Sequence, residues 1–284
     1  MTDGAADPAL LGALRAAAEE AARRGAAVLD GWRARFRVRE KAPADLVTDA
    51  DLASQEAIHT FLAREFPGHA FLGEEQLPGL PPRPVADGGG NGQAGPDERP
   101  TWVVDPIDGT INYVHDVPFY CVSVGLWAAG DLRVGAVYDP RGGEMFSAAQ
   151  GQGATLNGHP IRVSPVPRLR EALLSTGFPA DVAAQLRNLD WWRTFAPRAQ
   201  SLRRTGSTAL NLAYVAAGRF EGYWAFDNSP WDVAAGVVLV REAGGFVTRA
   251  DGSPCDPFRP DILATNGLLH AEMLECLRGG PGGG

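Results

Sequence analysis

The chain reads Asp105-Pro106-Ile107-Asp108-Gly109-Thr110 directly after the apolar run Trp102-Val103-Val104. The apolar run predicts a buried strand, and the proline and glycine fix two carboxylates three residues apart at its end. Buried carboxylates destabilise a core, whereas hard divalent cations such as Mg²⁺ bind carboxylate oxygens and keep positions open for water and phosphate. The segment therefore predicts metal-assisted phosphate chemistry, with further ligands supplied by other parts of the chain.

The bulk composition is that of an ordinary globular protein. The chain has 284 residues, 45% of them hydrophobic and 21% charged, which is enough for one large domain or two smaller ones. Its formal net charge is −8, from 26 basic and 34 acidic residues. The sequence therefore lacks the basic surface of a protein that binds nucleic acid or an anionic membrane.

The cysteines and the N-terminal residues favour a cytoplasmic location. Cys121, Cys255 and Cys276 lie far apart and include no CxxC pair, which fits a reducing compartment rather than a disulfide framework. Asp3 and Asp7 stand where a signal peptide carries positive charge, and no apolar stretch approaches the length of a membrane span. We expect a cytoplasmic protein without a membrane partner.

Hydrophobic periodicity and turn residues predict alternating helices and strands, and hence an α/β layered sandwich. We expect Ser207 to cap one helix that ends before Gly218, and Asn266 to cap the last helix. The expected helices cover 8–30, 51–65, 208–217 and 232–243, and the expected strands 120–127, 132–138, 246–248 and 261–264, with a further hairpin over 144–156. We expect the strands at 246–248 and 261–264 to be buried.

The segment 78–100 differs in composition from the rest, because Pro or Gly occupies more than half of its positions. Such a segment buries too little apolar surface to offset the entropy lost when it becomes ordered. We expect a single domain over 1–277, with a mobile insertion at 78–100 that acts as a flap, and a disordered tail at 278–284.

Four segments carry candidate chemistry: 41–51, 71–75, 105–110 and 230–236. Three of them also have a plain structural explanation. Asp49 or Asp51 could cap the helix that follows, Glu74 and Glu75 could form an exposed acidic turn, and Asp232 could cap another helix. The order of the four segments and their shared acidity favour one common site.

In this combination the chain resembles the inositol monophosphatase family of metal-dependent phosphomonoesterases. The resemblance is carried by Gly-Glu-Glu at 73–75, Asp-Pro-Ile-Asp-Gly-Thr at 105–110 with Asn-Tyr at 112–113, and Trp-Asp-Val-Ala-Ala-Gly at 231–236. It extends from about Leu10 to Leu277. It implies a five-layered αβαβα sandwich, two or three Mg²⁺ ions, a homodimer and inhibition by lithium.

The resemblance also implies roles for individual residues. The implied metal ligands are the side chains of Glu74, Asp105, Asp108 and Asp232 and the carbonyl of Ile107. Thr110 and Asp51 would form the water-activating pair, with Asp51 preferred to Asp49 because the segment 45–51 aligns at its last acid. Glu75 and Lys41 would support the site, and Asp232 would also contact the substrate.

Phosphate chemistry itself explains the need for two ions. A phosphomonoester dianion repels nucleophiles, and two metals about 4 Å apart stabilise both the attacking and the leaving oxygen. We expect water at the ion held by Glu74 to attack phosphorus, oriented by Thr110 and Asp51. The backbone N–H groups of Gly109 and Thr110 would face the phosphate.

The sequence departs from the family on the substrate side. Gly206-Ser207-Thr208 matches a family segment that lines the sugar or cyclitol pocket, although Ser207 is also a good helix cap. In the family's inositol phosphatases, a glutamate that holds ring hydroxyls commonly stands six residues before the Trp of the 231–236 motif. Here that position is Ala225, so the acceptor is missing unless Asp227 reaches the same space.

The leading hypothesis is a Mg²⁺-dependent phosphatase of a small phosphorylated alcohol, with inositol monophosphate as the first candidate. The alternatives are histidinol phosphate, fructose 1,6-bisphosphate or a 3′-phosphoadenosine nucleotide as substrate, or a non-catalytic regulatory protein on the same fold. The complete set of acids together with Thr110 argues against a purely non-catalytic role. The acidic net charge argues against direct nucleic-acid binding.

Overall fold

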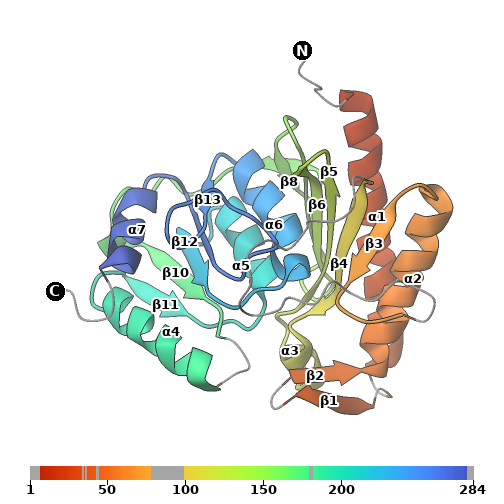
Figure 1. The fold of residues 1–284 in the computed structure, drawn as a ribbon, viewed down its shortest axis with the longest axis horizontal. Helices are drawn as coiled ribbons and strands as arrows, with labels where there is room; N and C mark the ends of the chain where they lie inside the picture. The colour runs from red at the N-terminus through yellow and green to blue at the C-terminus, as the bar shows by residue number, and fades with distance from the viewer. Residues whose placement is uncertain are drawn as a thin grey trace.

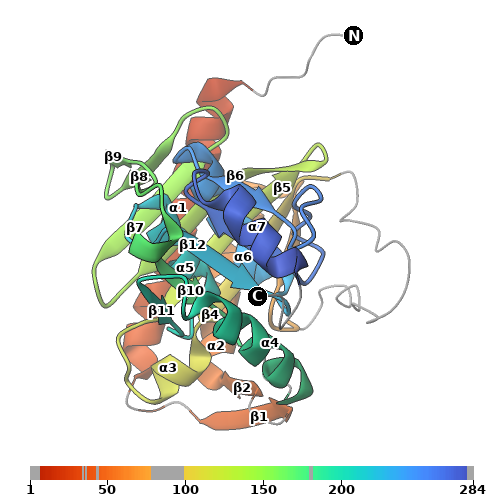
Figure 2. The same cartoon turned by 90° about the vertical axis from the view of Figure 1, so that its left-hand side faces the viewer.

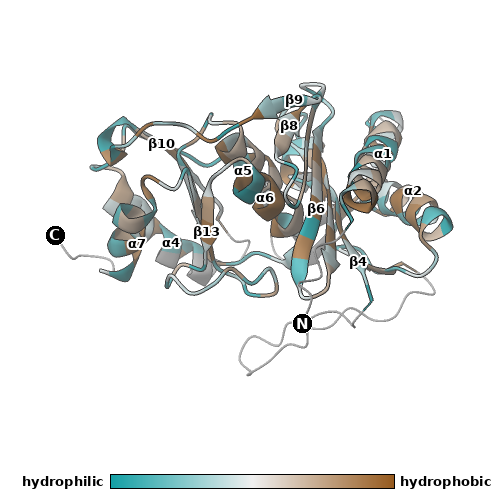
Figure 3. Ribbon diagram, turned by 90° about the horizontal axis from the view of Figure 1, so that it is seen from above, coloured by the Kyte–Doolittle hydropathy of each residue, from teal (hydrophilic) through white to brown (hydrophobic). Residues whose placement is uncertain are grey.

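Helices and sheets alternate through the molecule in five layers (Figure 1). The computed structural model describes residues 7–33, 35, 37–42, 45–77, 99–178 and 182–279, with the backbone alone at 40–42, 45–46, 182–184 and 187. The layers run helices, sheet, helices, sheet, helices, as the view from above also shows (Figure 3). The predicted α/β class and five-layered αβαβα sandwich are confirmed.

The larger sheet has seven strands, and its order follows the sequence from β3 to β9. β3 and β4 are parallel, and every later neighbour is antiparallel. Both predicted hairpins, β5–β6 and β7–β8, are confirmed. The strands are β3 (Ala70–Gly73), β4 (Thr101–Asp108), β5 (Cys121–Ala128), β6 (Asp131–Asp139), β7 (Glu144–Ala149), β8 (Ala154–Leu156) and β9 (His159–Ile161).

The smaller sheet has five strands in the order β11-β10-β12-β14-β13. They are β10 (Leu173–Thr176), β11 (Ser201–Arg203), β12 (Gly222–Ala225), β13 (Phe246–Thr248) and β14 (Ile262–Thr265). The strands expected near 246–248 and 261–264 are present, but the expectation that both are buried is wrong for Phe246. Its side chain is 54% exposed because β13 lies at the edge of the sheet.

Each face of each sheet is covered by helices. α1 (Pro8–Trp32) and α2 (Asp49–Glu65) cover the outer face of the larger sheet, and α4 (Val182–Phe195) and α7 (His270–Arg278) that of the smaller one. α5 (Thr208–Ala216) and α6 (Pro230–Glu242) lie between the two sheets and are buried along most of their length. The 3₁₀ turn η1 (Leu169–Glu171) precedes β10.

A small hairpin and a short helix stand beside the end of β4. The hairpin joins β1 (Val38–Ala42) to β2 (Asp45–Thr48), and α3 (Thr110–Val114) follows β4 directly. β2 and α3 lie side by side in both views (Figures 1 and 2). The chain segments before α2 and after β4 therefore meet at one end of the molecule.

The helix boundaries differ from the predicted ones where capping groups decide them. α2 begins at Asp49 rather than Asp51, because Thr48 is the N-cap and the Asp51 carboxylate accepts the Thr48 N–H. α5 follows Ser207 as predicted, with the Ser207 hydroxyl accepting from Leu210 N. Asn266 does not cap α7. It accepts from Leu269 N in the preceding turn, and the helix begins at His270.

Several other predictions meet the structure only in part. The insertion expected at 78–100 falls outside the described residues except for Arg99 and Pro100. The disordered tail expected at 278–284 is wrong for Arg278, which ends α7, and 280–284 lie outside the described residues. The three cysteines are free thiols. Among the helices of the described segments, none combines the length and apolar character needed to span a membrane.

Glycines let the buried helices approach the larger sheet closely. A Cβ on Gly135 of β6 would lie 2.3 Å from the carbonyl oxygen of Ala235, and one on Gly125 of β5 would lie 2.8 Å from Ala234 Cβ. A Cβ on Gly236 would lie 2.5 Å from Leu212 Cβ, so this glycine sets the contact between α6 and α5. The close packing of α6 against the sheet and against α5 therefore depends on the absence of these side chains.

We expect Gly135→Ala to lower the free energy of unfolding by about 1–3 kcal/mol, because its Cβ must push α6 away from the sheet. Gly12→Ala is the matched control. Its Cβ would meet no atom closer than 3.9 Å, and Ala is the better helix former by about 1 kcal/mol. Urea unfolding of both variants checks this, and a Gly135→Ala protein as stable as the wild type would contradict it.

Candidate metal centre

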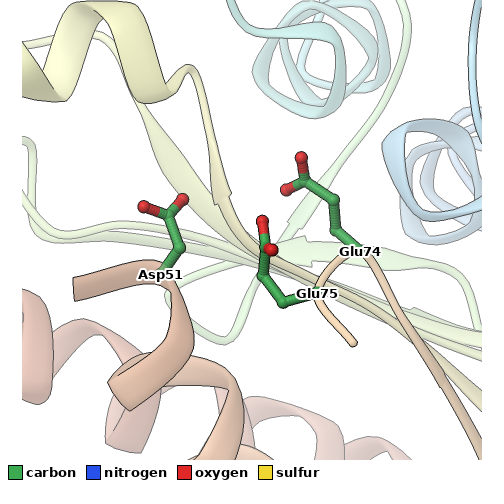
Figure 4. Close-up of side chains that lie close together, drawn as sticks. All are labelled: Asp51, Glu74 and Glu75. Atoms are coloured by element: carbon green, nitrogen blue, oxygen red, sulfur yellow. The ribbon is translucent and has the colours of Figure 1, made fainter. Parts of the chain in front are cut away.

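Acidic side chains from distant segments meet at one edge of the larger sheet. β3 and β4 are parallel, and Gly73 pairs with Val104, so the residues that follow each strand arrive together. Asp51, Glu74 and Glu75 each offer an oxygen within 4.8 Å of the others (Figure 4). Asp51 comes from the first turn of α2, whereas the two glutamates follow β3.

Asp105 lies at the centre of this acidic region. It is buried, and its Oδ1 accepts the backbone N–H of Ile107. Burial and the negative charges of neighbouring acids raise the pKa of Asp105 well above its ordinary value. In falling order of effect these neighbours are Glu74, Asp108, Asp232 and Asp51. The structure therefore brings together all five acids for which the sequence predicted a ligand or catalytic role.

Asp108 is held by the N-terminus of α5. Its Oδ2 accepts from Ser207 Oγ at 2.6 Å and from Ala209 N at 2.5 Å, and its Oδ1 accepts from Thr208 N at 3.1 Å. Burial raises the pKa of Asp108, and these hydrogen bonds oppose the shift. Ser207 and Thr208, which the sequence placed in the substrate pocket, thus contact a predicted metal ligand directly.

Asp232 stands at the third position of α6 and is half-buried. Its Oδ2 accepts the backbone N–H of Ser229 at 2.7 Å, so it also stabilises the start of the helix. Burial and the charge of Asp108 raise the pKa of Asp232 well above its ordinary value. Asp232 therefore both caps the start of α6 and belongs to the acidic region.

Thr110 and Asp51 lie together, as the sequence predicted. Thr110 Oγ1 lies 3.3 Å from Asp51 Oδ1 and 3.0 Å from the carbonyl oxygen of Ile107, and its proton can be donated to either. Asp51 Oδ2 accepts from both the N–H and the hydroxyl of Thr48. Asp49, by contrast, forms an ion pair with Arg39, which supports the choice of Asp51.

Gly109 and Gly206 let two loops approach each other beside the acids. Gly109 has φ +102° and Gly206 φ +91°, a region that other residues rarely adopt. A Cβ on Gly109 would lie 3.2 Å from the carbonyl oxygen of Gly206. Asn112 joins the same loops, because its Nδ2 donates to the carbonyls of Phe119 and Thr205.

The donor set fits a hard divalent cation. Within the described part of the chain, no arginine or lysine forms an ion pair with Asp105, Asp108 or Asp232, and buried like charges require a counterion. Cys121 Sγ is close to Asp108, but burial raises the pKa of this thiol, so it remains a hydrogen-bond donor rather than a soft thiolate ligand. Carboxylate oxygens therefore dominate the site.

The sequence matches the inositol monophosphatase family over residues 11–279. An inositol-1-monophosphatase of Synechocystis sp. is 41% identical over 94% of this chain and 89% of its own length. The chain belongs to the inositol monophosphatase family. Members of this family are phosphoric monoester hydrolases that depend on metal ions, and the acidic region at the end of β4 is where this member can hold one.

The chain is also similar to solved structures of inositol monophosphatases and to a protein named as a Nus factor. The inositol monophosphatase structure from Anabaena has a TM-score of 0.81, is 39% identical and covers 96% of this chain and 98% of that one. The Nus factor SuhB of Pseudomonas aeruginosa is 41% identical over 85% of this chain and 86% of its own length. A lithium-soaked inhibitory complex of a staphylococcal inositol monophosphatase has a TM-score of 0.75, at 26% identity, with 89% and 90% of the two chains covered.

The supporting and substrate-side positions implied by the family do not all lie among the central acids. Glu75, expected to have a supporting role, belongs to the tightest acidic group, and Lys41 lies in β1 with its side chain outside the described part of the structure. Ala225 is buried at the end of β12, whereas Asp227 beyond it is exposed. The structure thus brings together the acids that the family motifs name, and their roles stay predictions.

Two polar residues of α2 were not identified from the sequence. Ser54 Oγ donates to the carbonyl of Pro106 at 3.2 Å, and the side-chain amide of Gln55 binds the backbone of Glu75. Their spacing from Asp51, three and four residues, places all three on one helix face. That spacing is the signal that could have singled them out.

We expect Mg²⁺ to raise the melting temperature of the wild type, because a bound cation relieves the repulsion at Asp105. Saturation at about 100 times Kd corresponds to about 2.7 kcal/mol. Asp105→Asn should stabilise the metal-free protein and remove most of the Mg²⁺ response. Calorimetry with and without Mg²⁺ measures both effects.

Asp139→Asn is the control for this experiment. Asp139 is another buried aspartate whose pKa is raised by burial, but it caps a turn through Arg141 N and Gly142 N, apart from the acidic region. Its variant should keep the full Mg²⁺ response. An equal Mg²⁺ response in wild type and Asp105→Asn would show that Asp105 does not bind the ion.

Proposed function

We propose that the chain is a Mg²⁺-dependent phosphatase that hydrolyses the phosphomonoester of a small polyol, with inositol monophosphate as the leading candidate. The observation that carries the proposal is the convergence of five buried or half-buried acids on one site beside a threonine hydroxyl. These residues are Asp51, Glu74, Asp105, Asp108 and Asp232, with Thr110. The name of the Synechocystis relative supports the choice of substrate.

The proposed metal ligands are those that the family motifs imply: Glu74, Asp105, Asp108, Asp232 and the carbonyl of Ile107. Because all are oxygen donors, they favour Mg²⁺, and their number is enough for two or three ions. When bound, Mg²⁺ supplies positive charge to the phosphoryl and leaving oxygens and lowers the pKa of water. We propose that Lys41 and Glu75 support this arrangement at its edge.

Thr110 and Asp51 are the proposed proton-transfer pair. Because Thr110 Oγ1 donates to Asp51 or to the carbonyl of Ile107, its lone pairs remain available to accept a proton from the attacking water. Asp51 can receive the Thr110 proton at Oδ1, since Thr48 occupies Oδ2 with two hydrogen bonds and fixes the carboxylate. Glu74 faces the same space and would position the reacting water through the metal.

The substrate alcohol is proposed to lie over the N-terminus of α5. Ser207 and Thr208, which follow Gly206, donate to Asp108 there, and the Thr208 hydroxyl also bonds the hydroxyl of Tyr223 at 2.8 Å. Gly109, Thr110 and Asp232 would hold the phosphate end. Ala225 offers no acceptor for a ring hydroxyl, so a polyol would rely on backbone and hydroxyl groups at this side.

A regulatory binding role is the second candidate, because one close relative is named as a Nus factor. In either role we propose a cytoplasmic protein without direct nucleic-acid binding, which the free cysteines and the net charge of −8 support. We also propose the homodimer that the family resemblance implies. We also propose inhibition by Li⁺, as the lithium complex of the staphylococcal relative suggests.

Phosphate release across a substrate panel tests the proposal. The panel comprises inositol monophosphate, histidinol phosphate, fructose 1,6-bisphosphate and 3′-phosphoadenosine 5′-phosphate, each with Mg²⁺ and with EDTA. We expect Mg²⁺-dependent release, fastest with inositol monophosphate. Faster hydrolysis of another member would change the substrate but not the reaction. No release from any member would favour the regulatory role.

In the same assay, Asp51→Asn should lower kcat about 100- to 10,000-fold, since the variant cannot accept the proton of Thr110, with little change in KM. Asp49→Asn is the matched control two residues away, because Asp49 pairs with Arg39 instead. It should retain kcat within about threefold, as expected for loss of an exposed ion pair. Equal losses in both variants would refute the assignment of Asp51.

A further inference from the structure

One face of α2 holds three segments of the site. Asp51 lies against Thr110 in α3, Ser54 Oγ donates to the carbonyl of Pro106 in β4, and Gln55 binds the backbone of Glu75 after β3. The three residues fall within five consecutive positions of a rigid helix. The helix therefore fixes these segments relative to one another.

The contact of Gln55 is the most restrictive of the three. Its Nε2 donates to the carbonyl of Glu75 at 2.6 Å, and its Oε1 accepts the N–H of the same residue at 2.8 Å. The side chain is fully buried. A primary amide that pairs with both backbone groups of one residue fixes the position and the rotation of that peptide segment, as a neighbouring strand does.

Gly73 shows how tightly this amide is packed. A Cβ at Gly73 would lie 2.3 Å from Gln55 Oε1 and 2.5 Å from its Cδ, closer than real Cβ atoms come. Gly73 is not among the glycines with positive φ, so its backbone alone does not require glycine. The space needed by the Gln55 amide is what excludes a side chain at this position.

We propose that Gln55 is a positioning residue for metal binding, which fixes the Glu74–Glu75 segment at the distance from Asp51 that the ion requires. The inference rests on the proposed function, because the carboxylates must bind the ion. Asp51, Glu74 and Glu75 repel one another, and without the tether the segment after β3 relaxes away from α2. A glutamate at position 55 would lose the donor to the Glu75 carbonyl and add another negative charge.

Gln55→Met tests the proposal, since Met keeps the length of the side chain and removes both hydrogen bonds. Mn²⁺ serves as the probe, and isothermal titration calorimetry gives its affinity without reference to turnover. We expect about 10- to 100-fold weaker binding, the range for residues that orient metal ligands. The Mg²⁺ concentration for half-maximal phosphate release should rise by a similar factor, while kcat at saturating Mg²⁺ changes less.

Asn266→Leu is the matched control. Asn266 is also a buried amide with backbone partners, the carbonyls of Ser164 and Val166 and the N–H of Leu269. Asn266 directly follows Thr265, which pairs with Gly222 at the start of β12. Ala225 stands at the other end of the same strand. This variant should lower stability and keep the Mn²⁺ affinity of the wild type. Circular dichroism identifies the temperature at which all variants are folded.

A double-mutant cycle separates the tether from a general packing effect. Gly73→Ala alone should weaken Mn²⁺ binding, because its Cβ displaces the Gln55 amide. In a Gln55→Ala background the space is vacated, so Gly73→Ala should add little further loss. Additive losses would mean that Gly73 acts independently of Gln55 and would overturn the proposal.

The outcomes distinguish this inference from the proposed function. If the wild type neither binds Mn²⁺ nor releases phosphate, both the proposed function and the inference are refuted. If the wild type does both and Gln55→Met binds Mn²⁺ as tightly as the wild type, only the inference is refuted.

Discussion

Mutual repulsion among buried carboxylates is the constraint on which this structure depends. Asp105, Asp108 and Asp232 are held by neutral donors rather than by cationic side chains of the described residues: a backbone N–H from Ile107, the N-terminus of α5 and a backbone N–H from Ser229. Neutral donors fix the orientation of a carboxylate without cancelling its charge. The carboxylates therefore keep their mutual repulsion, which is the condition under which a bound cation would stabilise the fold.

The layered fold makes this concentration of charge possible. β4 ends between two helices, α5 and α6, whose N-termini point at the acids, and the partial positive charge of a helix N-terminus favours carboxylates. Glycines at 125, 135 and 236 bring these helices close to the sheet and to each other. On the other side, α2 contributes Asp51 and two polar neighbours. The acids therefore come both from β4 and the end of β3 and from the first turns of α2 and α6.

Family membership and the chemistry of the site answer different questions. The same family includes proteins named as phosphatases and one named as a Nus factor, so the fold alone does not decide the function. The complete acidic set and the Thr110–Asp51 contact favour catalysis in this chain.

Local sequence determined much of this protein. The apolar run before Asp105, the hairpin turns and the Ser207 cap were predictable, because strands, turns and caps depend on residues within a few positions of one another. The family motifs also predicted which acids lie near one another.

Only the tertiary structure decided how those acids are held. Asp108 meets its donors about a hundred residues away, and Glu75 meets the amide of Gln55 twenty residues away. Asn266 bonds back to Ser164 and Val166 instead of capping α7, and Phe246 is exposed because its strand lies at an edge. Such contacts arise from the packing of layers, and the spacing of residues along the chain does not encode them.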